Sequence, residues 1–174
     1  MDYRRIWHPG GTYFFTINLL QRKNNDLLIQ NIQLLRDSIK AVKVNHPFKT
    51  HGWVVLPEHM HCLIELPAND IDYATRIRLI KMGFSKAIPK NERRSAIRIK
   101  RGERGIWQRR YWEHLIRDEA DFQVHLDYIH YNPVKHGWVK QVKDWPYSTF
   151  HRWVERDVYP LNWAGIDENL YGVE

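Results

Sequence analysis

Residues 52–67 read GWVVLPEHMHCLIELP and contain the pattern on which the fold prediction rests. An apolar run on each side of Pro57 and Glu58 predicts two short strands joined by a tight turn, which is a β-hairpin. Because side chains alternate across a strand, His59 and His61 share one face of the second strand. The opposite face is apolar throughout and is expected to lie against the core, and its residues are Met60, Cys62, Ile64 and Leu66.

The segments around the hairpin alternate between strand and helix patterns. Residues 12–20 are rich in aromatic and β-branched residues and predict a strand. Asn31 is a good N-cap for a helix whose apolar residues recur at intervals of three and four, at Ile32, Leu35, Ile39 and Val42. A second helix with the same spacing is predicted over 73–84 and is expected to end before Pro89.

The C-terminal half completes the order of elements. Residues 106–116 predict a further strand or hairpin, and Asp118 caps a third helix that is expected to end near Asn132, before Pro133. The order strand, helix, two strands, helix, strand predicts an α+β fold with a ferredoxin-like βαββαβ sheet, extended by a helical C-terminal part. We expect one domain over residues 1–174, with the tail after about 153 lying across it as an arm.

Composition limits the class of protein. The 174 residues suffice for one domain with a core of its own, and a single cysteine excludes an internal disulfide framework. No stretch has the apolar length of a signal peptide core or a membrane span, so a soluble, cytoplasmic protein is expected. With 27 Lys and Arg against 20 Asp and Glu, the net charge of +7 suits a polyanionic partner, although it also suits simple solubility.

The two histidines of the hairpin are candidates for a metal site. Two imidazoles on one face of a strand can converge on a divalent cation, although two solvated histidines on a half-exposed strand would give the same pattern. On the third helix, Tyr128 and Asn132 lie one turn apart, with His125 beside them. A tyrosine can act as a covalent nucleophile, and an amide oxygen can complete the coordination of a cation.

Spacing alone does not choose the nucleophile, since Tyr131 and Tyr111 remain possible on chemistry alone. Basic residues gather between residues 90 and 112 and at the N-terminus. They could contact phosphates, and the aromatic rings among them could stack on unpaired bases, although a solvated basic surface is the simpler alternative. The candidates for nucleic-acid binding are Arg4, Arg5, Arg93, Arg94, Arg98, Arg101, Arg109, Arg110 and Trp112.

Several motifs together resemble one family. The combination of VVLPEHMHCLIELP with WQRRYWEHLIRD, DYIHYNPVKHGWV and DWPYSTFHRWV closely resembles the REP-associated tyrosine transposases, a branch of the HUH single-tyrosine transposases. The resemblance extends over nearly the whole chain, from GGTYFFTINL to YPLNWAG. The His-x-His motif paired with Tyr-x-x-x-Asn-Pro is far more specific than either part alone.

The resemblance implies a mechanism and a site. It assigns the cation, Mg²⁺ or Mn²⁺, to His59, His61 and Asn132, and the nucleophile to Tyr128, which would form a 5′-phosphotyrosine intermediate. Because related transposases use Gln at the last ligand position, the role of Asn132 is the least secure. The implied substrate is single-stranded DNA from repetitive extragenic palindromic (REP) elements folded as hairpins, and the implied protein is a monomer associated with the bacterial nucleoid.

Two alternatives of other classes remain open. A ferredoxin-like sheet with basic and aromatic residues could bind single-stranded nucleic acid without cutting it. A relaxase or replication initiator would use the same metal and tyrosine chemistry, but those proteins are usually larger. Formation of a covalent protein–DNA adduct distinguishes an enzyme from a binding module.

Overall fold

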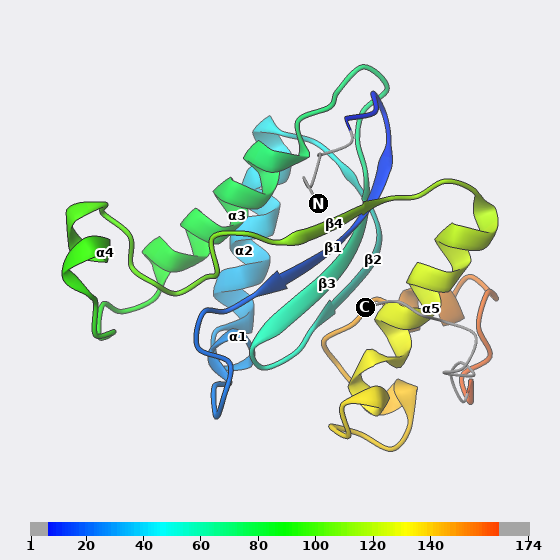
Figure 1. Cartoon of the computed structure of the whole chain (residues 1–174). Coiled ribbons are helices and arrows are strands. Elements are labelled where there is room, and N and C mark those ends of the chain that lie inside the picture. Colours follow the sequence, from blue (N-terminus) through cyan, green and yellow to red (C-terminus); the bar gives the residue numbers. More distant parts are fainter. Residues whose placement is uncertain (1–6, 164–174) are drawn as a thin grey trace, which may run out of the picture.

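The structure, a computed structural model, describes residues 7–163 (Figure 1). Its elements are β1 (Thr12–Asn18), α1 (Leu27–Gln30), α2 (Ile32–Asn45), β2 (Lys49–Val55), β3 (His59–Glu65), α3 (Tyr73–Ala87), α4 (Ala96–Lys100), β4 (Trp112–Leu115), α5 (Glu119–Lys135), the 3-10 turn η1 (Val142–Asp144) and α6 (Phe150–Val154). The strands form an antiparallel sheet in the order β2-β3-β1-β4, which is the order of a ferredoxin-like βαββαβ fold. The α+β prediction is therefore confirmed.

The two faces of the sheet carry separate cores. Met60, Cys62 and Ile64 pack on the side of α2 and α3 and are fully buried, as the alternation predicted. The opposite face is covered by α5, whose Leu126 and Ile129 are also fully buried. In Figure 1 the sheet accordingly lies between the α2–α3 pair and α5. The histidine face of β3 is thus interior rather than half-exposed, which the sequence pattern did not indicate.

The catalytic-helix candidate α5 begins as predicted and ends later than predicted. The Asp118 side chain accepts a hydrogen bond of 2.8 Å from the backbone N–H of Asp121, which caps the helix. Pro133 does not stop α5, which continues to Lys135. Gly137, which follows the end of the helix, terminates it: it has a φ of 72° and donates to the Val134 carbonyl, while the next N–H donates to the Pro133 carbonyl. The extra turn adds residues to the helix surface that faces the sheet.

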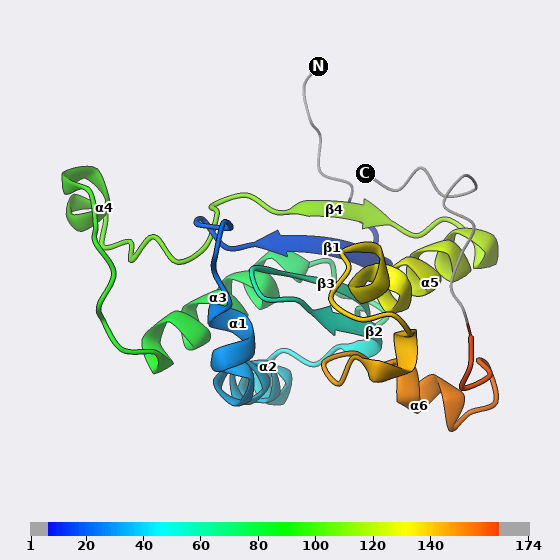
Figure 2. The same ribbon diagram turned by 90° about the horizontal axis from the view of Figure 1, so that it is seen from below.

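The basic region between α3 and β4 differs from the prediction. The segment expected to be a loop contains α4, which projects away from the sheet beyond the end of α3 (Figures 1 and 2). The expected strand over 106–116 is shortened to β4. Residues 106–108 still pair with the end of β1, because the Gln108 N–H donates to the Asn18 carbonyl at 3.0 Å and the Ile106 carbonyl accepts from the Leu20 N–H at 2.9 Å. The Trp107 indole donates to the Lys81 carbonyl at 3.1 Å and the Lys81 ammonium donates to the Gln108 carbonyl at 2.7 Å, which ties the same segment to α3.

Near the end of the described chain, Tyr159 is buried, and its ring lies 4.8 Å from that of Trp163. The remainder of the expected C-terminal arm lies outside the described residues. None of the helices in residues 7–163 combines the length and the apolar composition needed to cross a lipid bilayer.

Candidate active site

The pairing of β1 with β3 positions the histidine pair. His61 lies opposite Thr16 and His59 opposite Asn18 in the antiparallel register. The two imidazole centroids are 4.9 Å apart with their planes at 84°, and both rings are almost fully buried. The structure therefore brings the two side chains together beneath α5, in an enclosed setting where a cation would be shielded from bulk water.

Both imidazoles are oriented through their Nδ1 atoms. His59 Nδ1 lies 2.9 Å from a carboxylate oxygen of Glu58, which Arg22 also contacts at 3.1 Å. A carboxylate only accepts, so His59 Nδ1 donates, which leaves Nε2 as the ring nitrogen that could coordinate a cation. His61 Nδ1 lies 2.9 Å from the hydroxyl oxygen of Thr16, which can accept in the same way. A partner on one ring nitrogen that frees the other for coordination is the usual arrangement of metal-binding histidines.

The protonation states suit this arrangement. Burial alone would raise the pKa of Glu58, but the hydrogen bond and charge of His59 and the hydrogen bond of Arg22 outweigh it and lower that pKa to about 2. Burial, reinforced by the charges of His59 and His136, holds the pKa of His61 well below its usual value. At neutral pH the orienting carboxylate is therefore ionised, and His61 is neutral and able to coordinate.

The Tyr128 side chain projects from α5 toward the histidine pair. Its ring is buried to 7% exposure and lies with its centroid 5.2 Å from that of His61. The Lys135 ammonium lies 5.0 Å above the tyrosine ring. Tyr128, His59 and His61 line one cavity of about 220 Å³, to which Arg22 also contributes. A tyrosine, a histidine pair and the guanidinium of Arg22 thus meet in one cavity, where a phosphate group could bind.

Asn132 lies one turn beyond Tyr128 and is completely buried. Among the described residues, neither its amide nitrogen nor its amide oxygen has a hydrogen-bond partner, which is a costly state for a buried amide. Asn132 does not line the cavity, whereas His136, a further turn along, does. The His136 ring lies 5.3 Å from that of His59. His136 was not identified from the sequence. Its position two turns after Tyr128 places both residues on one face of a helix, and this spacing could have indicated it.

Tyr111 and Tyr131, the two other candidates for the nucleophile, do not line the cavity of the histidine pair. Tyr111 packs with its ring 5.8 Å from Phe15, on the α2–α3 side of the sheet and so opposite to the histidine pair. Tyr131 is partly buried against the core under α5 and does not line the cavity. The geometry thus separates Tyr128 from the two alternatives that residue type alone left open.

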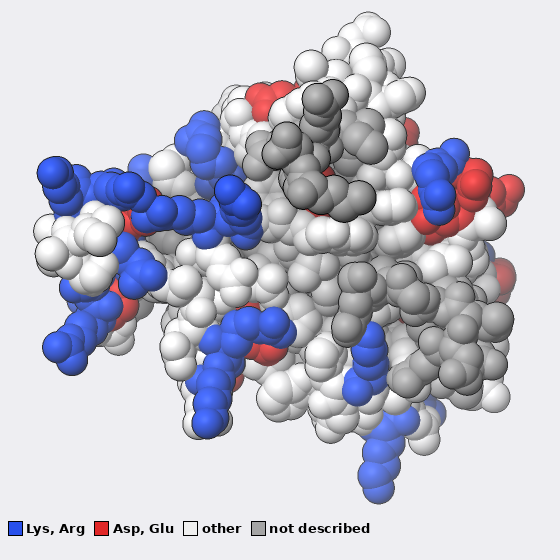
Figure 3. Space-filling view, viewed as in Figure 1, with Lys and Arg blue, Asp and Glu red and all other residues white. Residues whose placement is uncertain are grey.

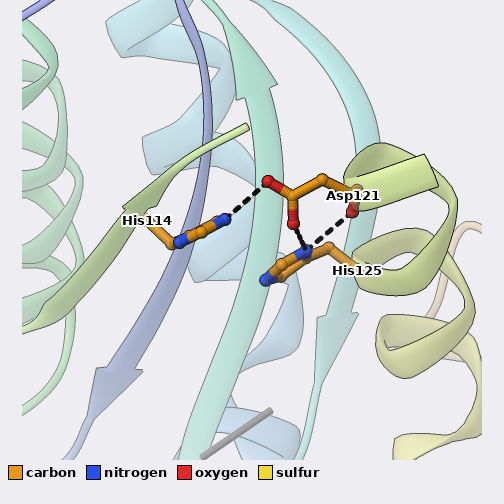
Figure 4. A group of neighbouring side chains, drawn as sticks. All are labelled: His114, Asp121 and His125. Atoms are coloured by element: carbon orange, nitrogen blue, oxygen red, sulfur yellow. Dashed lines mark hydrogen bonds and ion pairs between the residues drawn. The ribbon is translucent and has the colours of Figure 1, made fainter. Parts of the chain in front are cut away.

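A second histidine cluster lies beyond the cavity (Figure 4). His114 of β4 and Asp121 and His125 of α5 form the group of three potential ligands, among residues 7–163, whose ligand atoms lie within 4.8 Å of one another. His114 Nε2 is 2.8 Å from one Asp121 carboxylate oxygen, and His125 Nδ1 is 3.1 Å from the other. The sequence analysis noted one residue of this cluster, His125, and only because it lies near Tyr128 on the predicted helix.

The predicted nucleic-acid residues lie in two places. Trp112 lines the small cavity beside Tyr128. A groove of about 1490 Å³ between α3 and residues 90–111 contains most of the others, and ten of its lining residues are Lys or Arg, against Glu103 as the acidic one. Figure 3 shows this basic side chain cluster over the α4 segment. The groove includes Arg94, Arg98, Arg101, Arg109 and Arg110 but not Arg93.

The basic residues of this groove differ in how far their side chains are free to contact a ligand. Arg104 is tied to Glu92 at 2.6 Å and to backbone carbonyls of the α3–α4 connection, so it supports the loop. Arg109 pairs with Glu103 at 3.0 Å but remains more than half exposed. Burial lowers the pKa of Lys81 to about 8. Arg4 and Arg5, which were predicted to contact nucleic acid, lie outside the described residues.

Comparison with known proteins identifies the family. No protein-family model matches the chain. The chain is 51% identical over 164 residues to a REP-associated tyrosine transposase of Escherichia coli (strain K12), covering 94% of this chain and 91% of the relative. A Haemophilus influenzae relative named for the same family is 50% identical over 165 residues, covering 94% and 93% of the two chains. A solved structure of a REP-associated tyrosine transposase bound to a REP hairpin superposes with a TM-score of 0.82 at 49% identity, covering 95% of this chain and 92% of that one. The chain therefore belongs to the REP-associated tyrosine transposase family.

Proposed function

We propose that this protein cleaves and rejoins single-stranded DNA through a covalent tyrosine intermediate, acting on hairpins of REP elements in the bacterial nucleoid. The observation that carries the proposal is the placement of the Tyr128 ring 5.2 Å from that of His61 in one buried cavity. Support for the substrate comes from the similar structure, which is described as bound to a REP hairpin. A monomer with its site formed within one chain accords with α5 packing on the sheet of its own chain.

Membership in the family implies a divalent metal, and the residues present fit one. The Nε2 atoms of His59 and His61 are the coordinating atoms left by their Nδ1 partners, and the amide of Asn132 is buried without a partner among the described residues. We propose Mg²⁺ or Mn²⁺ held by these three side chains, since amide oxygens and imidazoles suit such ions. When bound, the cation would polarise and orient the scissile phosphate.

The chain's own residues then perform the transfer. The Tyr128 oxygen forms a bond to the phosphorus in line with the bond to the 3′ oxygen, which breaks. The hydroxyl proton leaves Tyr128, and the released 3′ oxygen takes up a proton to become a 3′ hydroxyl. The Lys135 ammonium near the ring favours the negative charge that develops on the tyrosine oxygen. Because phenolate is a good leaving group, a 3′ hydroxyl can later reverse the reaction without ATP.

A covalent adduct tests this function directly. Incubation of the full chain with a REP hairpin carrying a single-stranded foot, in the presence of Mn²⁺, should give a protein–DNA species that survives denaturing electrophoresis. A 3′-end label should travel with the protein, because the tyrosine holds the 5′ phosphate of the downstream fragment, while a 5′-end label should be released. Binding without any adduct would instead favour the single-stranded nucleic-acid-binding module, and a label retained from the other end would contradict the 5′ linkage.

The basic groove gives a second test. Replacing Arg94, Arg98 and Arg101 together by Gln should lower the slope of log affinity against log salt by about 2, since each phosphate contact contributes roughly 0.7 for single strands. These side chains line an open groove and form no ion pair within residues 7–163, so the fold should be retained. Fluorescence anisotropy with labelled hairpin DNA at several salt concentrations measures the slope.

The matched control removes three cations from another part of the surface, namely Arg36, Lys40 and Arg156, which are exposed and do not line the groove. This variant should keep the wild-type slope. Equal reductions in both variants would show that total charge, and not the groove, determines the salt dependence.

A further inference from the structure

Three rings form a stack that leads away from the cavity of Tyr128. Trp112 lies parallel to His114, with centroids 5.8 Å apart and planes at 6°, and His114 lies parallel to His125, at 4.6 Å and 14°. Exposure decreases along the stack, from 40% for Trp112 to almost full burial for His125. The indole is thus the outer end of a stack whose inner end is fixed on α5.

Asp121 holds the inner part of this stack in place. Its two carboxylate oxygens contact His114 and His125, and it also accepts from the backbone N–H of Arg117 at 3.0 Å. His125 Nδ1 lies 2.8 Å from the Asp121 carbonyl, which only accepts, so this nitrogen carries a proton. The hydrogen bonds shown in Figure 4 therefore link β4 to α5 and hold both imidazoles in fixed orientations.

The sheet register places the indole beside the reaction centre. Thr16 of β1 pairs with His61 on one side and with Trp112 on the other, so these three residues form one row across the sheet. Two strand spacings separate Trp112 from His61, which is about 10 Å. Trp112 also lines the cavity that contains Tyr128. Between them, Phe14 meets the Trp112 ring edge-on at 5.7 Å and stacks on His61 at 5.5 Å, which keeps both rings in fixed orientations.

We infer that Trp112 is the stacking platform for the base next to the scissile phosphate, and that His114, held by Asp121 and His125, is a positioning residue that fixes the plane of the indole. This subsite rests on the proposed function, because it takes the phosphate to lie at Tyr128. A base stacked on the indole would hold the neighbouring backbone against the histidine pair. Stacking accepts any base, so the platform sets the position of the strand rather than its sequence.

A double-mutant cycle between protein and DNA tests the platform without requiring any chemistry. The protein carries Tyr128→Phe, and the probes are hairpins in which each nucleotide of the single-stranded foot in turn is replaced by an abasic one. One abasic position should weaken binding by roughly 10- to 100-fold. Trp112→Ala should weaken binding of the intact hairpin by a similar factor and should remove the penalty of that one abasic position. Trp112→Phe, which keeps an aromatic face, should retain most of it.

His114 is tested by separating its ring from its hydrogen bond. His114→Ala should reduce the abasic penalty, and His114→Phe should restore it, because a ring again lies under the indole. Thermal stability should stay lowered in both variants, since each loses the contact with Asp121. A residue that served stability alone would show no such difference between the two variants in the DNA assay.

The matched control is Trp138→Ala, because Trp138 is an exposed tryptophan that does not line the cavity. It should leave every abasic penalty unchanged. The inference is overturned if Trp112→Ala keeps the penalty at all positions, or if no position in the foot has a penalty in the first place. If the wild-type chain forms no adduct while Trp112 still couples to one position of the foot, the proposed cleavage fails and the base subsite stands.

Discussion

Tyr128→Phe is expected to abolish both DNA cleavage and the covalent adduct while leaving folding and hairpin binding unchanged. The substitution removes one hydroxyl, and the ring keeps its contacts with Phe14, His61 and the Lys135 ammonium. Among the described residues, neither Tyr111 nor Tyr131 lines the cavity, so the loss should be complete rather than partial. Denaturing electrophoresis of labelled DNA measures the adduct, anisotropy measures binding, and thermal unfolding checks the fold.

Tyr131→Phe is the matched control, because it removes the same hydroxyl from the same helix. Three residues apart at about 100° per residue, the two side chains point in directions that differ by about 60°. Tyr131 packs against the core under α5, so its variant should retain cleavage. Peptide mapping of the trapped adduct decides the assignment. A DNA remnant on Tyr131 or Tyr111, with Tyr128 unmodified, would overturn it together with the placement of Asn132 at the cation.

Local periodicity was enough to predict the sheet and the orientation of the histidine pair. Alternation alone divides residues 59–66 between two faces, and the hairpin fixes the pairing of β2 with β3. The order of strands and helices then leaves few topologies, of which the ferredoxin-like one was correct. Part of the candidate site was predictable for the same reason, since His59 and His61 are close in sequence and their mutual geometry follows from the strand.

Contacts between distant elements were not predictable in this way. The periodicity of α5 does not show that the helix packs on the histidine face, which is why a half-exposed strand remained an alternative for the histidine pair. The hydrogen bond between His114 and Asp121 joins β4 to α5, and neither residue stands in a recognisable motif with the other. The error at Pro133 has a local cause: proline removes the bond that an N–H would make to the carbonyl four residues back, but α5 continues past this lost bond to Lys135, and Gly137 with its positive φ terminates it.

His59→Ala and His61→Ala are each expected to reduce cleavage by about a thousandfold or more, since a bound cation supplies several kcal/mol to the transition state and about 1.4 kcal/mol corresponds to a factor of ten. Hairpin affinity should remain within a few-fold, because the basic groove and the cavity share no lining residue. Single-turnover cleavage at increasing Mn²⁺ concentrations measures the loss, and His151→Ala, at an exposed histidine away from the cavity, is the control.

Substitution of the residues that orient the two imidazoles should give smaller losses of cleavage than removal of the imidazoles themselves. Thr16→Val removes the hydroxyl that orients His61, and Glu58→Gln removes the charge that orients His59, while both leave the proposed coordinating atoms in the protein. Each should weaken cleavage by about 10- to 100-fold and raise the Mn²⁺ concentration needed for half-maximal activity, as the loss of an orienting partner does at other metal sites. High Mn²⁺ should rescue these two variants but not His59→Ala or His61→Ala. Full cleavage by either alanine variant, or rescue of neither orienting variant, would show that the histidine pair does not hold the cation.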